Sequence, residues 1–133
     1  MTGGSLLIVE DEYIIALSQK QRLERHGFSV QLAYSGLQAL DAVEAAFQDG
    51  RQFDAILMDI NLGGGPDGIA LTRTLQLMDP SLLILFLSSQ PQSYLAQRAP
   101  DLLIFPFISK ATSPSTLPGL VAQHILERSS DRL

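Results

Sequence analysis

The sequence predicts an α/β protein in which five strand–helix units form three layers, a doubly wound parallel sheet between two layers of helices. Short apolar runs alternate along the chain with stretches of helical periodicity. The runs are continuously apolar, as expected for strands that are covered on both faces. The predicted strands are residues 5–9, 28–33, 53–58, 82–87 and about 102–108.

The helices that connect these strands have recognisable starts and stops. The first is expected to begin near Glu12 and to end at Gly27, because glycine commonly terminates a helix. Ser35 is the predicted cap of the second. The third should run from Asp67 to Pro80, since proline cannot continue a helix. Apolar residues recur every three or four positions in the second and last helices, at Leu37, Leu40, Val43 and Phe47 and at Leu117, Leu120, Val121, His124 and Ile125.

Length and composition restrict the function. The 133 residues suit a single domain, residues 1–133 with a core of about 5–128. The chain has no cysteine, which excludes disulfides and thiolate chemistry, and its net charge of −5 argues against direct binding of nucleic acid. No apolar stretch reaches the roughly 18 residues of a membrane span, and no signal peptide is recognisable. We therefore expect a cytoplasmic protein without a membrane partner.

Reactive side chains follow four of the five predicted strands. The first strand ends in Glu10-Asp11-Glu12, the third in Asp59, the fourth in Ser88-Ser89 and the fifth in Lys110. Ligands of open α/β sheets bind at these carboxyl ends. Carboxylates hold a hard divalent cation, whereas lysine and hydroxyl groups hold phosphoryl oxygens. Burying an unpaired carboxylate such as Asp59 at the end of a strand costs several kcal/mol, so we expect a cation at this edge. The whole set of carboxylates, hydroxyl and lysine suits phosphoryl chemistry.

These residues, in their order and spacing, resemble the receiver domain (CheY-like) of bacterial two-component response regulators. The resemblance covers essentially residues 5–128. It rests on five segments, Ile8–Glu12, Ile56–Leu62, Pro66–Gly68, Leu85–Ser89 and Lys110. It implies a flavodoxin-like (βα)5 fold with strand order 2-1-3-4-5. It also implies a phosphorelay switch whose own chemistry is limited to weak self-phosphorylation and self-dephosphorylation, rather than an enzyme.

The resemblance further implies a role for each site residue. Asp59 would accept a phosphoryl group from the phosphohistidine of a sensor histidine kinase or phosphotransfer protein. Lys110 would pair with Asp59 and then with the phosphoryl group. Ser88 and Phe107 would be the switch residues, which change the surface of the fourth helix, fifth strand and fifth helix. The implied Mg²⁺ ligands are Asp11, Asp59, the backbone carbonyl of Asn61 and, through a water molecule, Glu10.

The sequence departs from the family pattern in several places. Ala111 follows the lysine where the family usually has proline, so the turn there must be built differently. Ser88 replaces the commoner threonine. The glycine-rich loop 63–68 is one residue longer than expected, and we predict that it is mobile. The run 102–108, which contains Pro106, is unusually apolar. It could form a homodimer surface with the neighbouring helices, or it could simply fill the core.

Other functions fit less well. Gly63, Gly65 and Gly68 match the dinucleotide-binding pattern G-x-G-x-x-G, but the loop follows the third strand, where Asp59 would repel a pyrophosphate. Haloacid-dehalogenase-like phosphatases need a second aspartate two residues after the first, and this chain has Asn61 there. The remaining alternative is a pseudo-receiver, an interaction module that keeps the fold without being phosphorylated.

Overall fold

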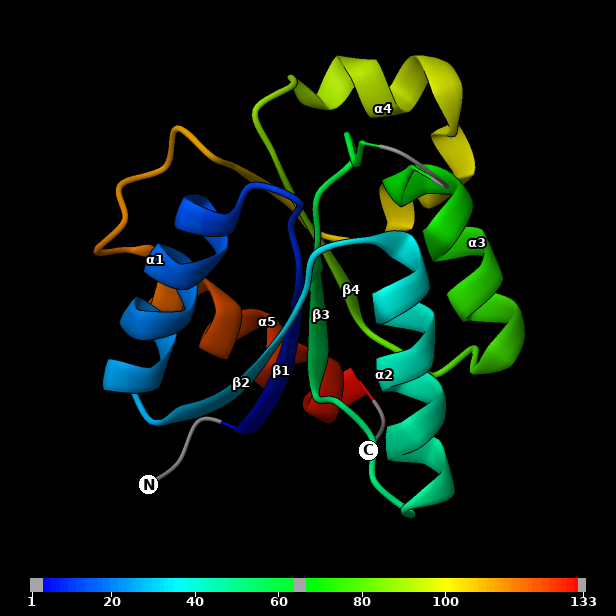
Figure 1. The fold of residues 1–133 in the computed structure, drawn as a ribbon. Helices are drawn as coiled ribbons and strands as arrows, with labels where there is room; N and C mark the ends of the chain where they lie inside the picture. Colours follow the sequence, from blue (N-terminus) through cyan, green and yellow to red (C-terminus); the bar gives the residue numbers. More distant parts are fainter. Residues whose placement is uncertain (1–3, 64–66, 132–133) are drawn as a thin grey trace.

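A five-stranded parallel sheet in the order β2-β1-β3-β4-β5 forms the centre of the computed structural model, which describes residues 4–63 and 67–131. This order and the flavodoxin-like fold confirm the prediction (Figure 1). The strands are β1 Gly4–Val9, β2 Phe28–Ala33, β3 Ala55–Met58, β4 Ile84–Ser88 and β5 Phe107–Ser109. Because all strands run in the same direction, their carboxyl ends meet at one edge of the sheet.

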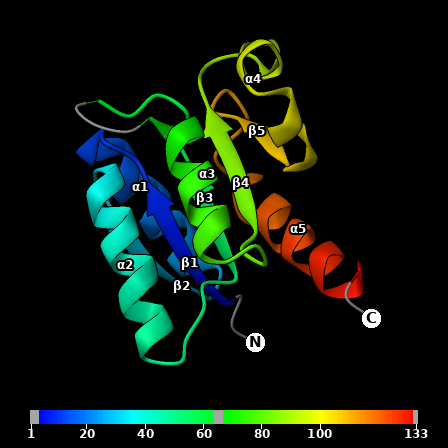
Figure 2. The same cartoon turned by 90° about the vertical axis from the view of Figure 1, so that its right-hand side faces the viewer.

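Helices cover both faces of the sheet, which gives the predicted three layers (Figures 1 and 2). One face packs against α1 and α5, and the other against α2, α3 and α4, each with its own cluster of buried apolar side chains. The bounds are α1 Tyr13–Arg25, α2 Gly36–Gln48, α3 Gly68–Met78, α4 Gln92–Arg98 and α5 Leu117–Asp131, with a short 3-10 helix, η1, at Pro100–Ile104.

The predicted helix ends are confirmed. The Ser35 hydroxyl accepts a hydrogen bond from the Gln38 amide at 3.2 Å and caps α2. Gly27 has a φ of +93°, the left-handed conformation in which glycine commonly follows a helix. The Asp67 carboxylate accepts from the Ala70 amide at 2.9 Å and caps α3. These local signals fix where each helix begins or ends relative to the sheet.

The predicted buried face of α2 was partly wrong. Leu37 and Phe47 are 68% and 71% exposed. The buried positions of this helix are small residues with Val43, namely Gly36, Ala39, Ala42, Val43 and Ala46. Small side chains let α2 lie close to the sheet. Close packing, rather than burial of the larger Leu37 and Phe47 side chains, therefore decides which face of α2 contacts the sheet.

Strand β2 departs from the continuously apolar pattern expected of the sheet. It lies at the sheet edge, where Ser29 and Gln31 are exposed while Phe28 and Val30 are buried. One face of this edge strand is therefore left to solvent, and its sequence alternates accordingly.

The fifth strand is much shorter than predicted and begins later. Instead of a strand over 102–108, the chain forms η1 and then the three-residue β5. Pro100 occupies the first turn of η1, where its missing N–H is not needed. Pro106 precedes β5 and takes part in the sheet through its carbonyl, which accepts from the Phe86 amide at 3.0 Å. The two prolines thus confine β5 to the residues that follow them.

Some sequence expectations fall outside the described residues. Of the glycine-rich loop predicted to be mobile, Gly64, Gly65 and Pro66 are among the residues that are not described. The same holds for residues 1–3 and 132–133. Within the ranges 4–63 and 67–131, no helix has the length and apolar character needed to cross a membrane.

Candidate functional site

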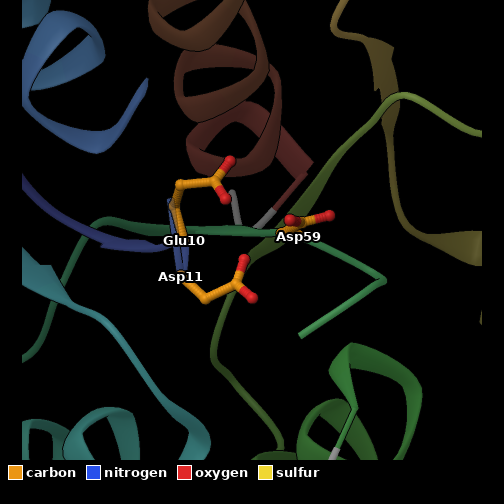
Figure 3. Close-up of side chains that lie close together, drawn as sticks. All are labelled: Glu10, Asp11 and Asp59. Atoms are coloured by element: carbon orange, nitrogen blue, oxygen red, sulfur yellow. The ribbon is translucent and has the colours of Figure 1, made fainter. Parts of the chain in front are cut away.

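Three carboxylates gather at the carboxyl edge of the sheet, as the sequence predicted. Val9 and Met58 are paired across β1 and β3, so the next residues of the two strands, Glu10 and Asp59, come side by side. Asp11 follows directly. Oxygen atoms of Glu10, Asp11 and Asp59 lie within 4.8 Å of one another (Figure 3). Glu10 and Asp59 are buried, whereas Asp11 is exposed.

Lys110 is the cation of this cluster. Its Nζ lies 3.1 Å from Asp59 Oδ2, the pairing expected from the sequence, and 2.5 Å from Glu10 Oε1, a partner that was not expected. The backbone explains its position, because the Lys110 amide donates to the Ser88 carbonyl at 2.8 Å and so continues the pairing of β5 with β4. The Lys110 ammonium therefore pairs with carboxylates that follow β1 and β3, and neither of these strands neighbours β5 in the sheet.

Burial and charge act in opposite directions on the ion pair. Burial raises the pKa of Glu10 above its ordinary value, and this outweighs the hydrogen bonds from Lys110 and the Glu12 amide, which lower it. For Lys110, burial lowers the pKa. The hydrogen bond to Glu10 and the charges of Asp59 and Glu10 outweigh that effect and hold its pKa above the usual value. Lys110 is therefore fully protonated at neutral pH.

Asp59 is held by the backbone around it. The Asn61 amide donates to Asp59 Oδ1 at 3.2 Å, and the Asp59 amide donates to the Val9 carbonyl at 3.1 Å. Helix α3 begins directly against this segment, since a Cβ atom on Gly68 would lie only 2.1 Å from the Asp59 carbonyl oxygen. Gly68 belongs to the segment Pro66–Gly68 that the sequence analysis singled out. The structure explains why glycine is needed there, because a side chain would collide with the backbone of Asp59.

The two predicted switch residues lie on β4 and β5. Ser88 ends β4 and is fully buried, and its hydroxyl accepts a hydrogen bond from the Gln90 amide at 3.0 Å. Phe107 begins β5 opposite Phe86, and its half-buried ring packs against the apolar cluster beneath α2, α3 and α4. Their predicted roles as switches stay predictions.

The turn after Lys110 is built without proline. All peptide bonds of the described residues are trans. The Ser109 side chain accepts from the Ala111 amide at 3.1 Å, and the Ser109 carbonyl accepts from the Thr112 amide at 2.9 Å. Hydrogen bonds to Ser109 thus shape the turn that the family usually forms with proline.

Other contacts of the site, besides the Lys110–Glu10 pair, were also not predicted from the sequence. The Gly63 amide donates to Asp11 Oδ2 at 2.9 Å. The Tyr94 hydroxyl lies 3.4 Å from Asn61 Oδ1, and the Arg98 guanidinium stacks on the Tyr94 ring at 3.5 Å from its centroid. The glycine pattern around Gly63 gives no indication of a contact with Asp11, and Tyr94 belongs to no recognisable pattern. Both contacts depend on how loops and α4 fold over the sheet edge.

The side chains of the cluster suit a hard divalent cation. Glu10, Asp11 and Asp59 offer only oxygen atoms, and Lys110 compensates one of their three negative charges. Magnesium prefers carboxylate, carbonyl and water oxygens in such a setting. The excess of negative charge on neighbouring oxygens is the observation that favours a cation here.

Comparison with known proteins gives a consistent match. The family model described as the response regulator receiver domain matches residues 6–122. The sensor kinase CckA of Brucella abortus is 28% identical over 121 residues, which cover 91% of this chain but only 12% of that kinase. The sporulation initiation phosphotransferase F of Bacillus subtilis is 26% identical over 102 residues, or 77% of each protein.

Solved structures show the same architecture. A response regulator receiver protein from Sinorhizobium medicae has a TM-score of 0.77 and 25% identity, with 94% of this chain and 96% of that one covered. A sensor protein from Polaromonas has a TM-score of 0.81 and 25% identity, covering 94% and 98%. The family model, at residues 6–122, includes the sheet edge described above, from Glu10 to Lys110.

Proposed function

Because the chain belongs to the response regulator receiver domain family, we propose that Asp59 is the phosphoacceptor of a two-component phosphorelay. The acidic pocket of Glu10, Asp11 and Asp59 beside Lys110 is the observation that supports this proposal. The donor is the phosphohistidine of a sensor histidine kinase or of a phosphotransfer protein. The protein acts in the cytoplasm as a switch and binds no nucleic acid directly.

In the proposed transfer, an Asp59 carboxylate oxygen attacks the phosphorus. A P–O bond forms as the P–N bond to the donor imidazole breaks, and the bonding electrons leave with the imidazole nitrogen. Lys110 already contacts Asp59 Oδ2 and moves its ammonium onto a phosphoryl oxygen. The Ser88 hydroxyl turns from the Gln90 amide to donate to another phosphoryl oxygen.

Magnesium is the proposed cofactor. Asp11, Asp59 and the Asn61 backbone carbonyl would hold it directly, and Glu10 through a water molecule. When bound, it neutralises negative charge that would otherwise oppose attack of a carboxylate on an anionic phosphoryl group. Glu10 is already paired with Lys110 at 2.5 Å, which suits an indirect part in cation binding.

The donor protein docks, in this proposal, beside the sheet edge. An apolar groove of about 360 Å³ lies between α1 and the segment that joins β5 to α5, and Lys110 forms part of its wall. Ile14 in the groove is 81% exposed, so its apolar side chain is open to a docking partner. Groove residues include Ile14, Ile15, Leu87, Pro114 and Leu117.

Phosphorylation of Asp59 is proposed to change the surface formed by α4, β5 and α5. Movement of Ser88 towards the phosphoryl group lets Phe107 turn further into the core. The apolar run before β5 is divided between buried and exposed side chains. Leu102 and Phe105 are buried, whereas Leu103 and Ile104 are exposed next to α4 and favour a dimer contact.

A direct experiment tests the phosphoacceptor. The protein with Mg²⁺ and beryllofluoride should form an adduct, and acetyl phosphate should add one phosphoryl group detectable by mass spectrometry. Asp59→Asn should abolish both, while Asp41→Asn, a change at an exposed position of α2, should leave both intact. Failure of the unmodified protein to form either adduct would favour the pseudo-receiver, an interaction module independent of phosphorylation.

A further inference from the structure

Asp11 differs from the other two carboxylates of the cluster in the group that stabilises it. Glu10 and Asp59 both contact the Lys110 ammonium. Asp11 Oδ2 instead accepts the backbone N–H of Gly63 at 2.9 Å. This bond ties the end of β1 to the segment after β3, across 52 positions of sequence. A backbone amide, rather than a charged side chain, therefore offsets the charge of Asp11.

The approach of Gly63 to Asp11 is close. A Cβ atom on Gly63 would lie 3.1 Å from Asp11 Oδ2, which is tighter than ordinary van der Waals contact. Gly63 does not have the positive φ of Gly27, so an L-residue is permitted by its backbone. A Cβ atom at position 63 would therefore displace the Asp11 carboxylate by a few tenths of an ångström and disturb its bond to the Gly63 amide.

We propose that the Gly63 amide competes with the divalent cation for Asp11 Oδ2, so that cation binding releases Gly63 and moves the segment after β3. The inference rests on the proposed function, since it assigns a regulator to the same cation site. A cation on Oδ2 withdraws electron density from the oxygen and brings a positive charge close to the amide hydrogen.

Competition of this kind lowers the affinity for the cation and links cation binding to the position of the segment after β3. Cation binding must first break a hydrogen bond to a charged acceptor, which weakens the apparent affinity by about tenfold. The released segment includes Asn61, whose amide contacts Asp59. The position of this loop beside the phosphorylation site would then report whether the cation is bound.

Amide hydrogen exchange and chemical shift of Gly63, measured by NMR on the full chain during Mg²⁺ titration, test the proposal. We expect the Gly63 amide to shift as Mg²⁺ saturates and its exchange to accelerate by about tenfold. Unchanged exchange at Gly63, while other resonances of the site report saturation, would overturn the proposal.

Gly63→Ala gives a second readout. Its Cβ atom would disturb the bond to Asp11, so we expect Mg²⁺ to bind several-fold tighter. Gly119→Ala is the matched control, because a Cβ there meets no atom within 4 Å. Equal or weaker Mg²⁺ binding by Gly63→Ala would show that the amide positions Asp11 instead of competing. Beryllofluoride adducts on the same samples distinguish the competition from the proposed phosphoacceptor function. If the adduct forms while the Gly63 amide resonance and exchange stay unchanged, only the competition is refuted. If neither the adduct nor Mg²⁺ binding is detected, the phosphoacceptor function is refuted as well.

Discussion

Lys110 and Glu10, 100 residues apart in the sequence, form a 2.5 Å ion pair on the same ammonium group that contacts Asp59. The pair joins the residue after β5 to the residue after β1, although neither strand neighbours the other in the sheet. Asp59, after the central strand β3, lies between them. Lys110 therefore acts as a structural cation for the sheet edge as well as a candidate contact for a phosphoryl group.

Removal of that ammonium should destabilise the fold. Lys110→Met leaves the buried Glu10 and Asp59 carboxylates without their cation, and we expect a loss of about 3 kcal/mol in the free energy of unfolding. The raised pKa of Lys110 means that its contribution is complete below pH 10.5 and disappears only as pH rises through the raised value. Urea unfolding at pH 7 measures the loss. Lys110→Arg, which keeps the charge, should lose less, and an unchanged midpoint for Lys110→Met would contradict the prediction.

Glu10 should make the free energy of unfolding depend on pH above pH 4.5, whereas Lys110 does so only above pH 10.5. Burial raises its pKa above 4.5, so the charged form of Glu10 is less favourable in the folded state than in the unfolded chain. The stabilisation is full below pH 4.5 and is lost as pH rises through the raised pKa. Glu10→Gln is neutral throughout, so we expect its melting temperature to exceed that of the unmodified protein at pH 7 and to match it near pH 4. Melting curves over this range test the sign, and a variant that is less stable at pH 7 would show that the Lys110 pair outweighs burial.

The contact between α3 and Asp59 should not tolerate a side chain. In Gly68→Ala the new Cβ would lie 2.1 Å from the Asp59 carbonyl oxygen, so α3 or the backbone of Asp59 must move. We expect about 3 kcal/mol of destabilisation, at the upper end for overpacking, together with weaker beryllofluoride binding. Gly119→Ala in α5 is the control and should be neutral or up to about 1 kcal/mol stabilising. Chemical denaturation of both variants gives the comparison, and equal stabilities would exclude a close contact.

The exposed apolar residues of η1 should determine any self-association. Ile104 is 78% exposed, and Leu103 lies beside it. We expect a dimer by light scattering when beryllofluoride and Mg²⁺ are present, and a monomer for Ile104→Asp under the same conditions. Phe47→Asp is a matched control on α2, where an equally exposed apolar side chain lies on a different face. A monomer for the unmodified protein, both with and without beryllofluoride, would exclude the dimer.

The sheet and its reactive edge could be predicted because each depends on local signals. Continuous apolar runs identify buried strands, and the residue after each run must lie at the carboxyl edge. This is why Asp59, Asp11, Ser88 and Lys110 were found. The same signals failed where packing decides between equally apolar faces. In α2, alanines approach the sheet while Leu37 and Phe47 face solvent.

Contacts between loops could not be predicted for a different reason. The bonds of Gly63 to Asp11 and of Tyr94 to Asn61 depend on the path of the chain after a strand ends. Apolar periodicity carries no information about that path. The run before β5 misled the prediction similarly, because apolar residues in a 3-10 helix and in a strand look alike without the effect of Pro100 and Pro106 on the backbone.

The short strand β5 should make its edge of the sheet open more easily than the centre. A strand of three residues at the sheet edge has few backbone hydrogen bonds to lose, so it should separate from β4 at a lower free energy than the central strands separate from one another. Its amides should therefore exchange with solvent earlier than those of β1 and β3. Since Lys110 follows this strand directly, local opening of β5 would carry the ammonium away from Glu10 and Asp59 while the rest of the fold stays closed.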